Sequence, residues 1–400
     1  MTEILSDLYA LMFESRDLRR AAVFEILSGG RVRKDVLKMF AEHLVKLLNI
    51  LNENRKKILE TAGDVRIVLD LSYEIEEMKK DVFFLKHDEQ DFYAYLSDMH
   101  RGFDEQLKTG VSFLKGIDYQ NVFTDRDGTV NNYCGRYRSS IQSVYNAVFL
   151  SRFAMSCVKN ASVITSAPLK DVGLMDISVV PEGTFVLAGS KGREYYNKKR
   201  EYGRFPVDDE KQKKLDEIND VLAKIIKDPV YEKFGLIGSG LQFKFGQTTI
   251  ARQDVQSSIP EDVSDSFLKK ITGIVEEIDP EKKFFRIEDT GTDIEIILTV
   301  EHSGEEGLSD FDKKDGMFFL NNELDLGLEE GPNLICGDTS SDLPMIKGSL
   351  EKGAETKSVF VKNNKNMEED VRKVCDSTFF VDNPDILVTI LNELSKKEVS

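Results

Sequence analysis

Residues 121–129 read NVFTDRDGT, a short apolar run followed directly by two aspartates and Gly-Thr. The carboxylates of Asp125 and Asp127 are two residues apart, so they lie on the same side of an extended segment and repel each other. Placing both carboxylates at one point is favourable only if a cation or a reaction at that point stabilises their negative charges. This stretch therefore predicts a functional site at the carboxyl end of a strand.

The chain on both sides of this stretch alternates short apolar runs with helical patterns. Compact apolar runs occur at residues 121–124, 162–165, 333–337, 358–361 and 378–381. Such runs are typical of parallel strands that are buried on both faces of a sheet. In open α/β sheets, ligands bind at the carboxyl ends of the strands. We therefore expect the polar residues that follow these runs to share one site.

Three further segments place polar residues at a strand end or a helix start. They are VITSAP with Thr165 or its neighbour Ser166, FDKKDGMFFL with the pair Lys313 and Lys314, and CGDTSSDLPM with Asp338 and Asp342. Each motif alone has a structural explanation, because DxDGT can be a turn with Asx caps and GDxxxD can be a helix N-cap. Their order, spacing and strand context together favour a site.

This set of residue types suits phosphoryl transfer. A phosphate ester resists attack because it is anionic, and a Mg²⁺ ion held by a few carboxylates lowers that repulsion. Ligands can come from Asp125, Asp338, Asp342 and the backbone carbonyl of Asp127. One carboxylate can be a nucleophile that forms an aspartyl-phosphate, and a second can protonate the leaving alcohol and then activate water. A hydroxyl at Thr165 and a lysine ammonium can hold the phosphate oxygens.

Residues 1–115 differ from the rest of the chain. They contain no proline, and apolar residues recur at spacings of three and four, as in Val36, Phe40, Leu44, Leu47 and Leu51. This pattern predicts long amphipathic helices, with breaks at residues 28–31 and 61–64. We expect an all-α, coiled-coil-like bundle of three helices with antiparallel neighbours. Its apolar stripe is either buried in the bundle or available for self-association or a protein partner.

Residues 186–303 show a third sequence pattern. Apolar or alternating strand patterns surround two helical patterns, one at 209–227 and one that starts at Pro260. We interpret this segment as a second α/β layer inserted into the first sheet. The insertion divides the first α/β domain into residues 116–185 and 304–400.

Composition limits the function classes. The chain has 400 residues and a formal net charge of −17, which argues against a nucleic-acid-binding protein and against docking on anionic membranes. No apolar stretch is long enough to span a bilayer, and the first residues lack a secretory signal, so we expect a cytoplasmic protein. The four cysteines lack CxxC spacing, and the four histidines do not cluster, so we expect neither a disulfide framework nor a zinc site.

The motifs together resemble the haloacid-dehalogenase superfamily of phosphatases, with a large C2-type cap between the second and third motifs. A narrower resemblance is to trehalose-6-phosphate phosphatases, over about residues 116–390. It is carried by GSKGRE (189–194), which is similar to that family's G-x-H-G-x-E segment, by Lys244 and Arg252, and by Glu295 in DIEII. The helical region before the phosphatase resembles the microtubule-interacting-and-transport-like extension of one branch of that family.

The resemblance implies a fold and a function. The fold would be α/β, with a Rossmann-like parallel-sheet core, an inserted α/β C2-type cap (186–303) and an N-terminal helical bundle. The function would be Mg²⁺-dependent hydrolysis of trehalose 6-phosphate to trehalose and phosphate, a step of trehalose biosynthesis. The alternatives are another sugar phosphate, such as sucrose phosphate or mannosyl-phosphoglycerate, a phosphomutase, or an interaction protein that uses the helical bundle.

Residue roles follow from the same resemblance. Asp125 resembles the nucleophile and Asp127 the general acid/base, while Thr165 and Lys313 would hold phosphate. Magnesium would be ligated by Asp125, Asp127 through its carbonyl, and Asp338, with Asp342 a direct or water-mediated partner. The cap residues expected to face the sugar are Lys191, Arg193, Glu194, Lys244, Arg252 and Glu295. The sequence departs from the family pattern with Lys191 in place of histidine, Gln242 in place of an acid, and Lys314 directly after Lys313.

Overall fold

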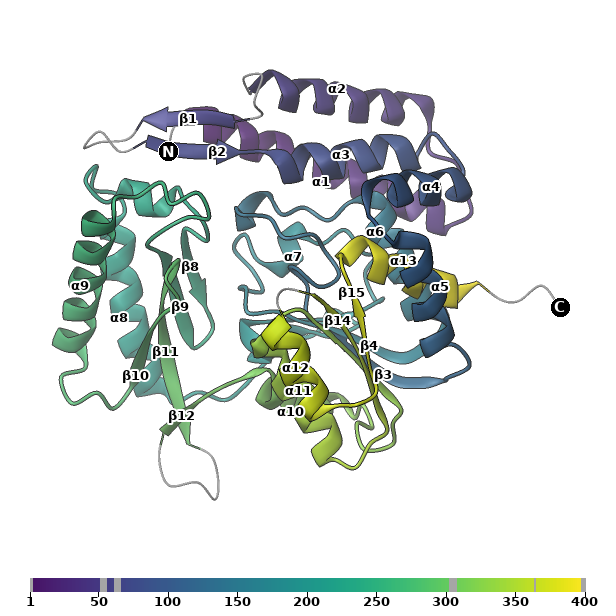
Figure 1. Cartoon of the computed structure of the whole chain (residues 1–400). Coiled ribbons are helices and arrows are strands. Elements are labelled where there is room, and N and C mark those ends of the chain that lie inside the picture. Colours follow the sequence, from purple (N-terminus) through teal and green to yellow (C-terminus); the bar gives the residue numbers. More distant parts are fainter. Residues whose placement is uncertain (1–2, 51–55, 61–65, 302–307, 363–364, 397–400) are drawn as a thin grey trace.

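The structure is a computed structural model that describes residues 3–50, 56–60, 66–301, 308–362 and 365–396. Figure 1 shows an N-terminal region lying across an α/β core and a smaller α/β cap, which stand side by side beneath it. In the described ranges, no helix combines the length and the apolar character needed to cross a lipid bilayer.

The N-terminal region combines helices with a β-hairpin. Its described elements are α1 (Glu3–Leu27), α2 (Lys34–Ile50), β1 (Lys56–Glu60), β2 (Arg66–Asp70), α3 (Ser72–Phe84), α4 (Glu89–Met99) and α5 (Phe103–Leu114). We expected three helices here, but the structure has an antiparallel β1–β2 hairpin and then three shorter helices after α2. Within β2, Ile67 and Leu69 are buried and Val68 between them is half-buried, which is the two-residue period of a strand.

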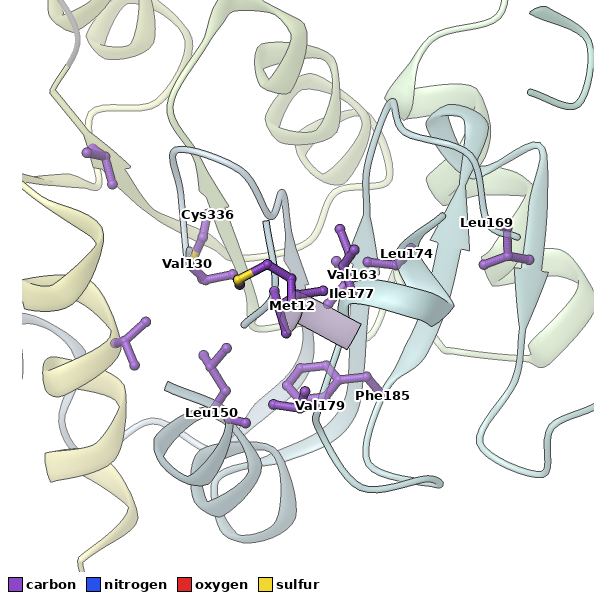
Figure 2. Close-up of a cluster of buried hydrophobic side chains, with 14 of the residues drawn as sticks. Met12, Val130, Leu150, Val163, Leu169, Leu174, Ile177, Val179, Phe185 and Cys336 are labelled. Carbon is purple, nitrogen blue, oxygen red and sulfur yellow. The ribbon is translucent and has the colours of Figure 1, made fainter. Parts of the chain in front are cut away.

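Helices α1 and α3 are joined to the core by buried contacts. Arg19 of α1 pairs with Asp81 of α3 at 2.6 Å and donates to the carbonyl of Ile141 at 2.9 Å. Asp81 also accepts a hydrogen bond from the backbone N–H of Val144 in the core, at 2.6 Å. Figure 2 shows Met12 of α1 within a cluster of buried core side chains. The N-terminal region and the core therefore share one hydrophobic interior.

The core is built on a sheet whose described strands follow the order β15-β14-β13-β3-β4-β5-β6-β7. Their bounds are β3 (Tyr119–Thr124), β4 (Val158–Ile164), β5 (Val186–Gly189), β6 (Glu194–Tyr196), β7 (Tyr202–Arg204), β13 (Asn333–Gly337), β14 (Thr356–Val361) and β15 (Thr378–Val381). The pairings from β15 to β5 are parallel, whereas β6 and β7 are antiparallel. The predicted parallel-sheet α/β core is confirmed, with β3 at its centre.

Both faces of this sheet are covered. Helices α6 (Val144–Ser156), α13 (Pro384–Ser395) and α5 pack together on one face, and α10 (Lys313–Leu324), α11 (Leu343–Glu351) and α12 (Lys365–Val374) on the other (Figure 1). The short helix α7 (Leu174–Ile177) packs against β5. Consecutive residues Val122 and Phe123 of β3 belong to two different hydrophobic clusters, because successive side chains of a strand point to opposite faces.

Residues 186–204, which we assigned to the cap from the sequence, lie in the core sheet. Strand β5 pairs with β4, and β6 and β7 extend the same sheet outward. The run VLAG is short and apolar like the other core strands, so its sequence pattern gave no sign of the boundary between core and cap. The separate cap elements begin after β7.

The cap is a small antiparallel sheet with two helices. Its described elements are α8 (Asp209–Ile225), β8 (Leu241–Lys244), β9 (Gln247–Ala251), α9 (Glu261–Ile278), β10 (Phe285–Asp289), β11 (Asp293–Glu301) and β12 (Leu308–Asp310). The strand order is β10-β11-β9-β8, and β12 also pairs with β11. Figure 1 shows α8 and α9 together against this sheet. The chain then returns to the core through α10.

Candidate active site

The carboxyl ends of β3 and β13 bring Asp125 and Asp338 together. The backbone N–H of Asp125 bonds to the carbonyl of Cys336, which continues the register of the two strands. The hydroxyl of Thr129 lies 3.3 Å from Oδ2 of Asp125 and 3.2 Å from Oδ1 of Asp338. Gly128 has a φ of +91°, and a Cβ there would lie 2.2 Å from Oδ2 of Asp338. The Asp-Gly-Thr turn therefore requires glycine to let the two motifs meet.

The buried ammonium of Lys313, at the start of α10, joins two carboxylates. Its Nζ lies 2.6 Å from Oδ1 of Asp125 and 2.6 Å from Oδ1 of Asp342. The other oxygen of Asp342 accepts hydrogen bonds from the backbone N–H groups of Asp338 and Thr339, each at 3.0 Å. Lys314 instead points to the surface, where it pairs with Glu351 at 3.3 Å. The structure therefore brings Lys313 to the cluster, and not Lys314.

The cluster carries more negative than positive charge. Oxygens of Asp125, Asp338 and Asp342 lie within 4.8 Å of one another. Burial raises the pKa of Asp125 to about 6, with repulsion from Asp342 added and attraction to Lys313 opposing it. Burial and repulsion from Asp125 and Asp342 raise the pKa of Asp338 to about 8. Shifts of this sign are expected where several buried carboxylates face one another, and a bound cation would relieve them.

Asp127 has different surroundings from Asp125. Its carboxylate oxygen Oδ1 accepts hydrogen bonds from the guanidinium of Arg126 and, at 3.0 Å, from the hydroxyl of Ser140. Arg126 also donates to the backbone carbonyl of Ser140, which fixes the loop that carries the acid. Asp127 lies outside the three-carboxylate cluster but lines the same cavity. The two aspartates of the DxD motif are thus held in separate environments.

A cavity of about 240 Å³ joins these core residues to the cap. Its lining includes both hydroxyl candidates, Thr165 and Ser166, at the end of β4. The cap contributes Gly238, Ser239, Gln242, Lys244, Thr249, Asp293 and Glu295. A larger cavity of about 600 Å³ lies beside Arg20 and Arg200, but it does not contain the carboxylate cluster. The candidate active site is therefore the smaller cavity, which contains the carboxylates and Lys313.

Lys244 and Glu295 face each other on the cap side of this cavity. Their charged atoms, Nζ and Oε1, are 3.9 Å apart. Burial lowers the pKa of Lys244, and the charge of Glu295 opposes that effect. A buried ammonium and a partly exposed carboxylate are suitable groups for binding the hydroxyls of a sugar.

Two family models match the chain. One, described as trehalose-6-phosphate phosphatase, C-terminal, covers residues 122–387, and the other, the trehalose-6-phosphate phosphatase N-terminal helical bundle domain, covers residues 4–102. The chain belongs to the trehalose-6-phosphate phosphatase family. The resemblance found in the motifs is thereby confirmed, and the first model includes every candidate site residue described above.

Individual relatives of this trehalose-6-phosphate phosphatase family member are distant. An alpha,alpha-trehalose-phosphate synthase [UDP-forming] 2 of Aphelenchoides avenae is 29% identical over 99% of this chain, which spans 32% of that protein. A trehalose-phosphatase of Brugia malayi is 25% identical over 98% of this chain and 86% of its own length. The C-terminal domain of the C. albicans trehalose-6-phosphate phosphatase matches 72% of this chain and 96% of its own, with 14% identity and a TM-score of 0.47. The chain thus spans about a third of the length of the first curated relatives it matches.

The GSKGRE segment of this family member is part of the core and does not line the cavity. The backbone N–H of Lys191 donates to the carbonyl of Thr165 at 2.8 Å. A Cβ on Gly316, in the first turn of α10, would lie 2.1 Å from the carbonyl oxygen of Lys191. The segment therefore contacts both the strand end that carries Thr165 and the helix that carries Lys313.

Three of the predicted cap residues are likewise not brought to the cavity. Arg193 is buried and donates to the carbonyls of Gly246 and Leu298, at 2.8 and 2.9 Å. Glu194 accepts from the hydroxyl of Ser190 at 2.9 Å. Arg252 has the three partners Ser264, Asp289 and Asp265, at 2.9, 2.6 and 2.5 Å. In this structure, the charges of these residues are used to join segments of the protein.

The cavity also contains residues that our sequence analysis did not select. They include Tyr133, Tyr137, Ser239, Thr249 and Asp293. Of these, Asp293 had a usable signal, because it precedes Glu295 by two residues on β11 and so shares its side of the strand. The tyrosines lie on the loop after the DxD motif, where no periodicity marks a side chain's direction.

Proposed function

We propose that this chain is a Mg²⁺-dependent phosphatase that hydrolyses trehalose 6-phosphate to trehalose and phosphate. The observation that carries the proposal is the contact of Lys313 with Asp125 at the cavity between core and cap, within the segment matched by the family model. The buried carboxylate cluster behind this contact has the ligand type that Mg²⁺ prefers.

The cluster fits a hard divalent cation. Asp125, Asp338 and the backbone carbonyl of Asp127 are the proposed ligands. Asp342 already binds Lys313 and two backbone N–H groups, so its proposed role is to position these groups, with contact to the ion through water. When bound, Mg²⁺ would offset the charge of the phosphate ester.

Each catalytic step would then be carried out by a residue of this chain. An oxygen of Asp125 attacks phosphorus, the bond from phosphorus to the sugar oxygen breaks, and Asp127 gives its proton to the leaving oxygen. Asp127 next takes a proton from water, the water oxygen attacks the aspartyl-phosphate, and the bond to Asp125 breaks to release phosphate. Lys313 and Thr165 hold phosphate oxygens through both steps.

The distribution of charge favours one orientation of the substrate. The phosphate belongs on the core side, next to Lys313, and the neutral sugar belongs beside Lys244 and Glu295. We propose that the cap opens to admit the substrate and closes to exclude bulk water. Another sugar phosphate, such as sucrose phosphate or mannosyl-phosphoglycerate, would use the same core chemistry and differ only at the cap.

The proposal is tested by phosphate release from trehalose 6-phosphate, sucrose 6-phosphate, glucose 6-phosphate and para-nitrophenyl phosphate. We expect the highest kcat/KM for trehalose 6-phosphate, and loss of activity with a chelator that added Mg²⁺ restores. Faster release from a different sugar phosphate would discard the substrate assignment. Activity that persists after chelation would discard the metal requirement.

A second proposed function concerns a protein partner or self-association through the N-terminal helices. Phe40 and Leu47 of α2 are buried, whereas Val45 and Leu48 of the same helix are 55% and 42% exposed. Sedimentation of the wild type and of a Val45→Lys, Leu48→Lys variant tests this proposal. A lower mass for the variant supports it, and a monomeric wild type rules out self-association.

A cytoplasmic location stays a prediction, which imaging of a tagged full-length protein would check.

A further inference from the structure

Two polar atoms at the candidate cavity have no hydrogen-bond partner. Among the residues that the structure describes, nine buried side-chain atoms lack a partner, and only Oδ1 of Asp293 and the hydroxyl of Tyr137 belong to residues that line this cavity. Buried polar atoms of native proteins are nearly always hydrogen-bonded, so an exception needs a physical reason. A ligand that enters the cavity is one such reason.

Asp293 lies on the cap side, at the start of β11. Its backbone pairs with Ala251 of β9, which fixes its position in the sheet. Its other oxygen, Oδ2, is 3.3 Å from the hydroxyl of Thr292. Glu295, two residues later on the same side of the strand, is next to Lys244. The cap therefore presents two carboxylates and one ammonium to the cavity.

Tyr137 comes from the core. It follows the loop that carries Asp127, and it lines the same cavity as Asp293. Its hydroxyl can both donate and accept, whereas a carboxylate can only accept. The two side chains therefore offer complementary hydrogen bonds from the two parts of the protein that enclose the cavity.

The chemistry of these atoms selects the kind of ligand. Burial raises the pKa of Asp293. The charge of Lys244 and the hydroxyls of Ser239 and Thr292 oppose this shift and compensate the desolvation of the carboxylate only in part. A phosphate group beside Asp293 and Glu295 would be repelled. Hydroxyl groups, in contrast, would donate hydrogen bonds to the carboxylate and remove the penalty of an unsatisfied buried acceptor.

We infer that Asp293 accepts a hydrogen bond from a sugar hydroxyl of the substrate, and that Tyr137 binds a second hydroxyl from the core side. Both residues are then specificity-determining contacts for the part of the substrate that does not react. This inference rests on the proposed function and adds two residues to it. A site that hydrogen-bonds substrate hydroxyls discriminates strongly against compounds that lack them.

The test compares a sugar phosphate with a phosphate ester that has no sugar. KM and kcat are measured for trehalose 6-phosphate and for para-nitrophenyl phosphate, in the wild type, Asp293→Ala, Asp293→Asn and Tyr137→Phe. We expect KM for trehalose 6-phosphate to rise about tenfold or more in Asp293→Ala, and less in Asp293→Asn, which keeps an acceptor oxygen. KM for para-nitrophenyl phosphate should change less than about twofold. Tyr137→Phe should show the same selectivity.

The matched control is Asp220→Asn, which changes an exposed aspartate on cap helix α8 and should leave both KM values unchanged. Thermal unfolding shows which variants are folded. If Asp293→Ala does not fold, Asp293→Asn takes its place in the comparison. Equal changes for both substrates, or none, in a folded variant would overturn the inference, because ordered water would then be the partner of these atoms. A wild type that releases phosphate only from para-nitrophenyl phosphate would overturn the proposed function as well, so the two failures are distinguishable.

Discussion

The ammonium of Lys313 lies 2.6 Å from the carboxylate of Asp125, although the whole cap is inserted between them in the sequence. Both groups are buried, and Asp342 holds the other side of the same ammonium. Attraction to the two carboxylates outweighs burial and raises the pKa of Lys313. The positive charge is therefore permanent at neutral pH and is fixed beside the carboxylate that is proposed to attack phosphorus.

The two adjacent lysines should respond differently to the same substitution. Lys313→Met removes the charge beside Asp125, so we expect kcat to fall by about 100-fold or more, as for other groups that stabilise transition-state charge. Lys314→Met is the matched control, because Lys314 pairs with Glu351 at the surface, and its kcat should stay within about twofold of wild type. Steady-state kinetics with Mg²⁺ decide between them. Equal losses in both variants would contradict the assignment.

The pH dependence of stability should reveal the carboxylate cluster. The pKa of Asp338 is raised to about 8 in the folded protein, whereas an unfolded aspartate has a value of about 3.9. Its contribution to stability is therefore complete below about pH 4 and is lost as the pH rises through about 8. In the presence of a chelator, Asp338→Asn should become progressively more stable than wild type over this range.

Denaturant unfolding at several pH values measures that difference. Added Mg²⁺ should stabilise the wild type most at high pH, where the carboxylates are charged, and should stabilise Asp338→Asn less. A stability difference that does not change between pH 4 and pH 8 would show that Asp338 is not desolvated in this way.

A buried ion pair joins the N-terminal region to the last core helix. Lys80 of α3 lies 2.6 Å from Asp385 of α13 and 2.8 Å from Glu77. Lys80→Met removes the ammonium between two buried carboxylates and leaves Asp385 with His100, at 2.7 Å, as its remaining basic partner. It should therefore lower the free energy of unfolding by about 3 to 5 kcal/mol. Lys79→Met, at a half-buried neighbouring position, should change it by less than about 0.5 kcal/mol. Equal unfolding midpoints for the two variants would indicate that the N-terminal region is not part of the folded unit.

Two Gly→Ala substitutions should have opposite effects. At Gly316, a Cβ would lie 2.1 Å from the carbonyl oxygen of Lys191, so Gly316→Ala should destabilise the protein by about 1 to 3 kcal/mol and lower kcat by displacing Lys313. At Gly273, inside helix α9, a Cβ would have no atom within 4 Å, so Gly273→Ala should stabilise it by up to about 1 kcal/mol. Thermal unfolding and kcat provide the check. A neutral Gly316→Ala would mean that the GSKGRE segment does not support α10.

The core of this fold was predictable because its signals are local. Each catalytic candidate directly follows a short apolar strand or starts a helix, so chain order and the rule for strand ends were enough to group Asp125, Thr165 and Asp338. The choice between Lys313 and Lys314 was not local, because it depends on which of the two side chains reaches Asp125. The strands at residues 56–60 and 66–70 were missed because five-residue strands gave a weaker periodic signal than the helices around them.

The cap residues were harder to predict for a physical reason. A charged side chain gives no sign in the sequence of whether it faces a ligand or a neighbouring carbonyl, and Arg193 faces the carbonyls of Gly246 and Leu298. Alternation along a strand was a better guide, because it placed Glu295 at the cavity and could have placed Asp293 there too.

The role of Asp125 as the nucleophile is tested most directly by kcat for trehalose 6-phosphate with Mg²⁺ in Asp125→Asn. Asparagine has almost the same shape but is a poor nucleophile, so we expect a loss of kcat of about 1,000-fold or more, with an unfolding midpoint no lower than that of wild type. An Asp125→Asn protein that is folded and retains full activity would contradict the assignment of Asp125 as the nucleophile.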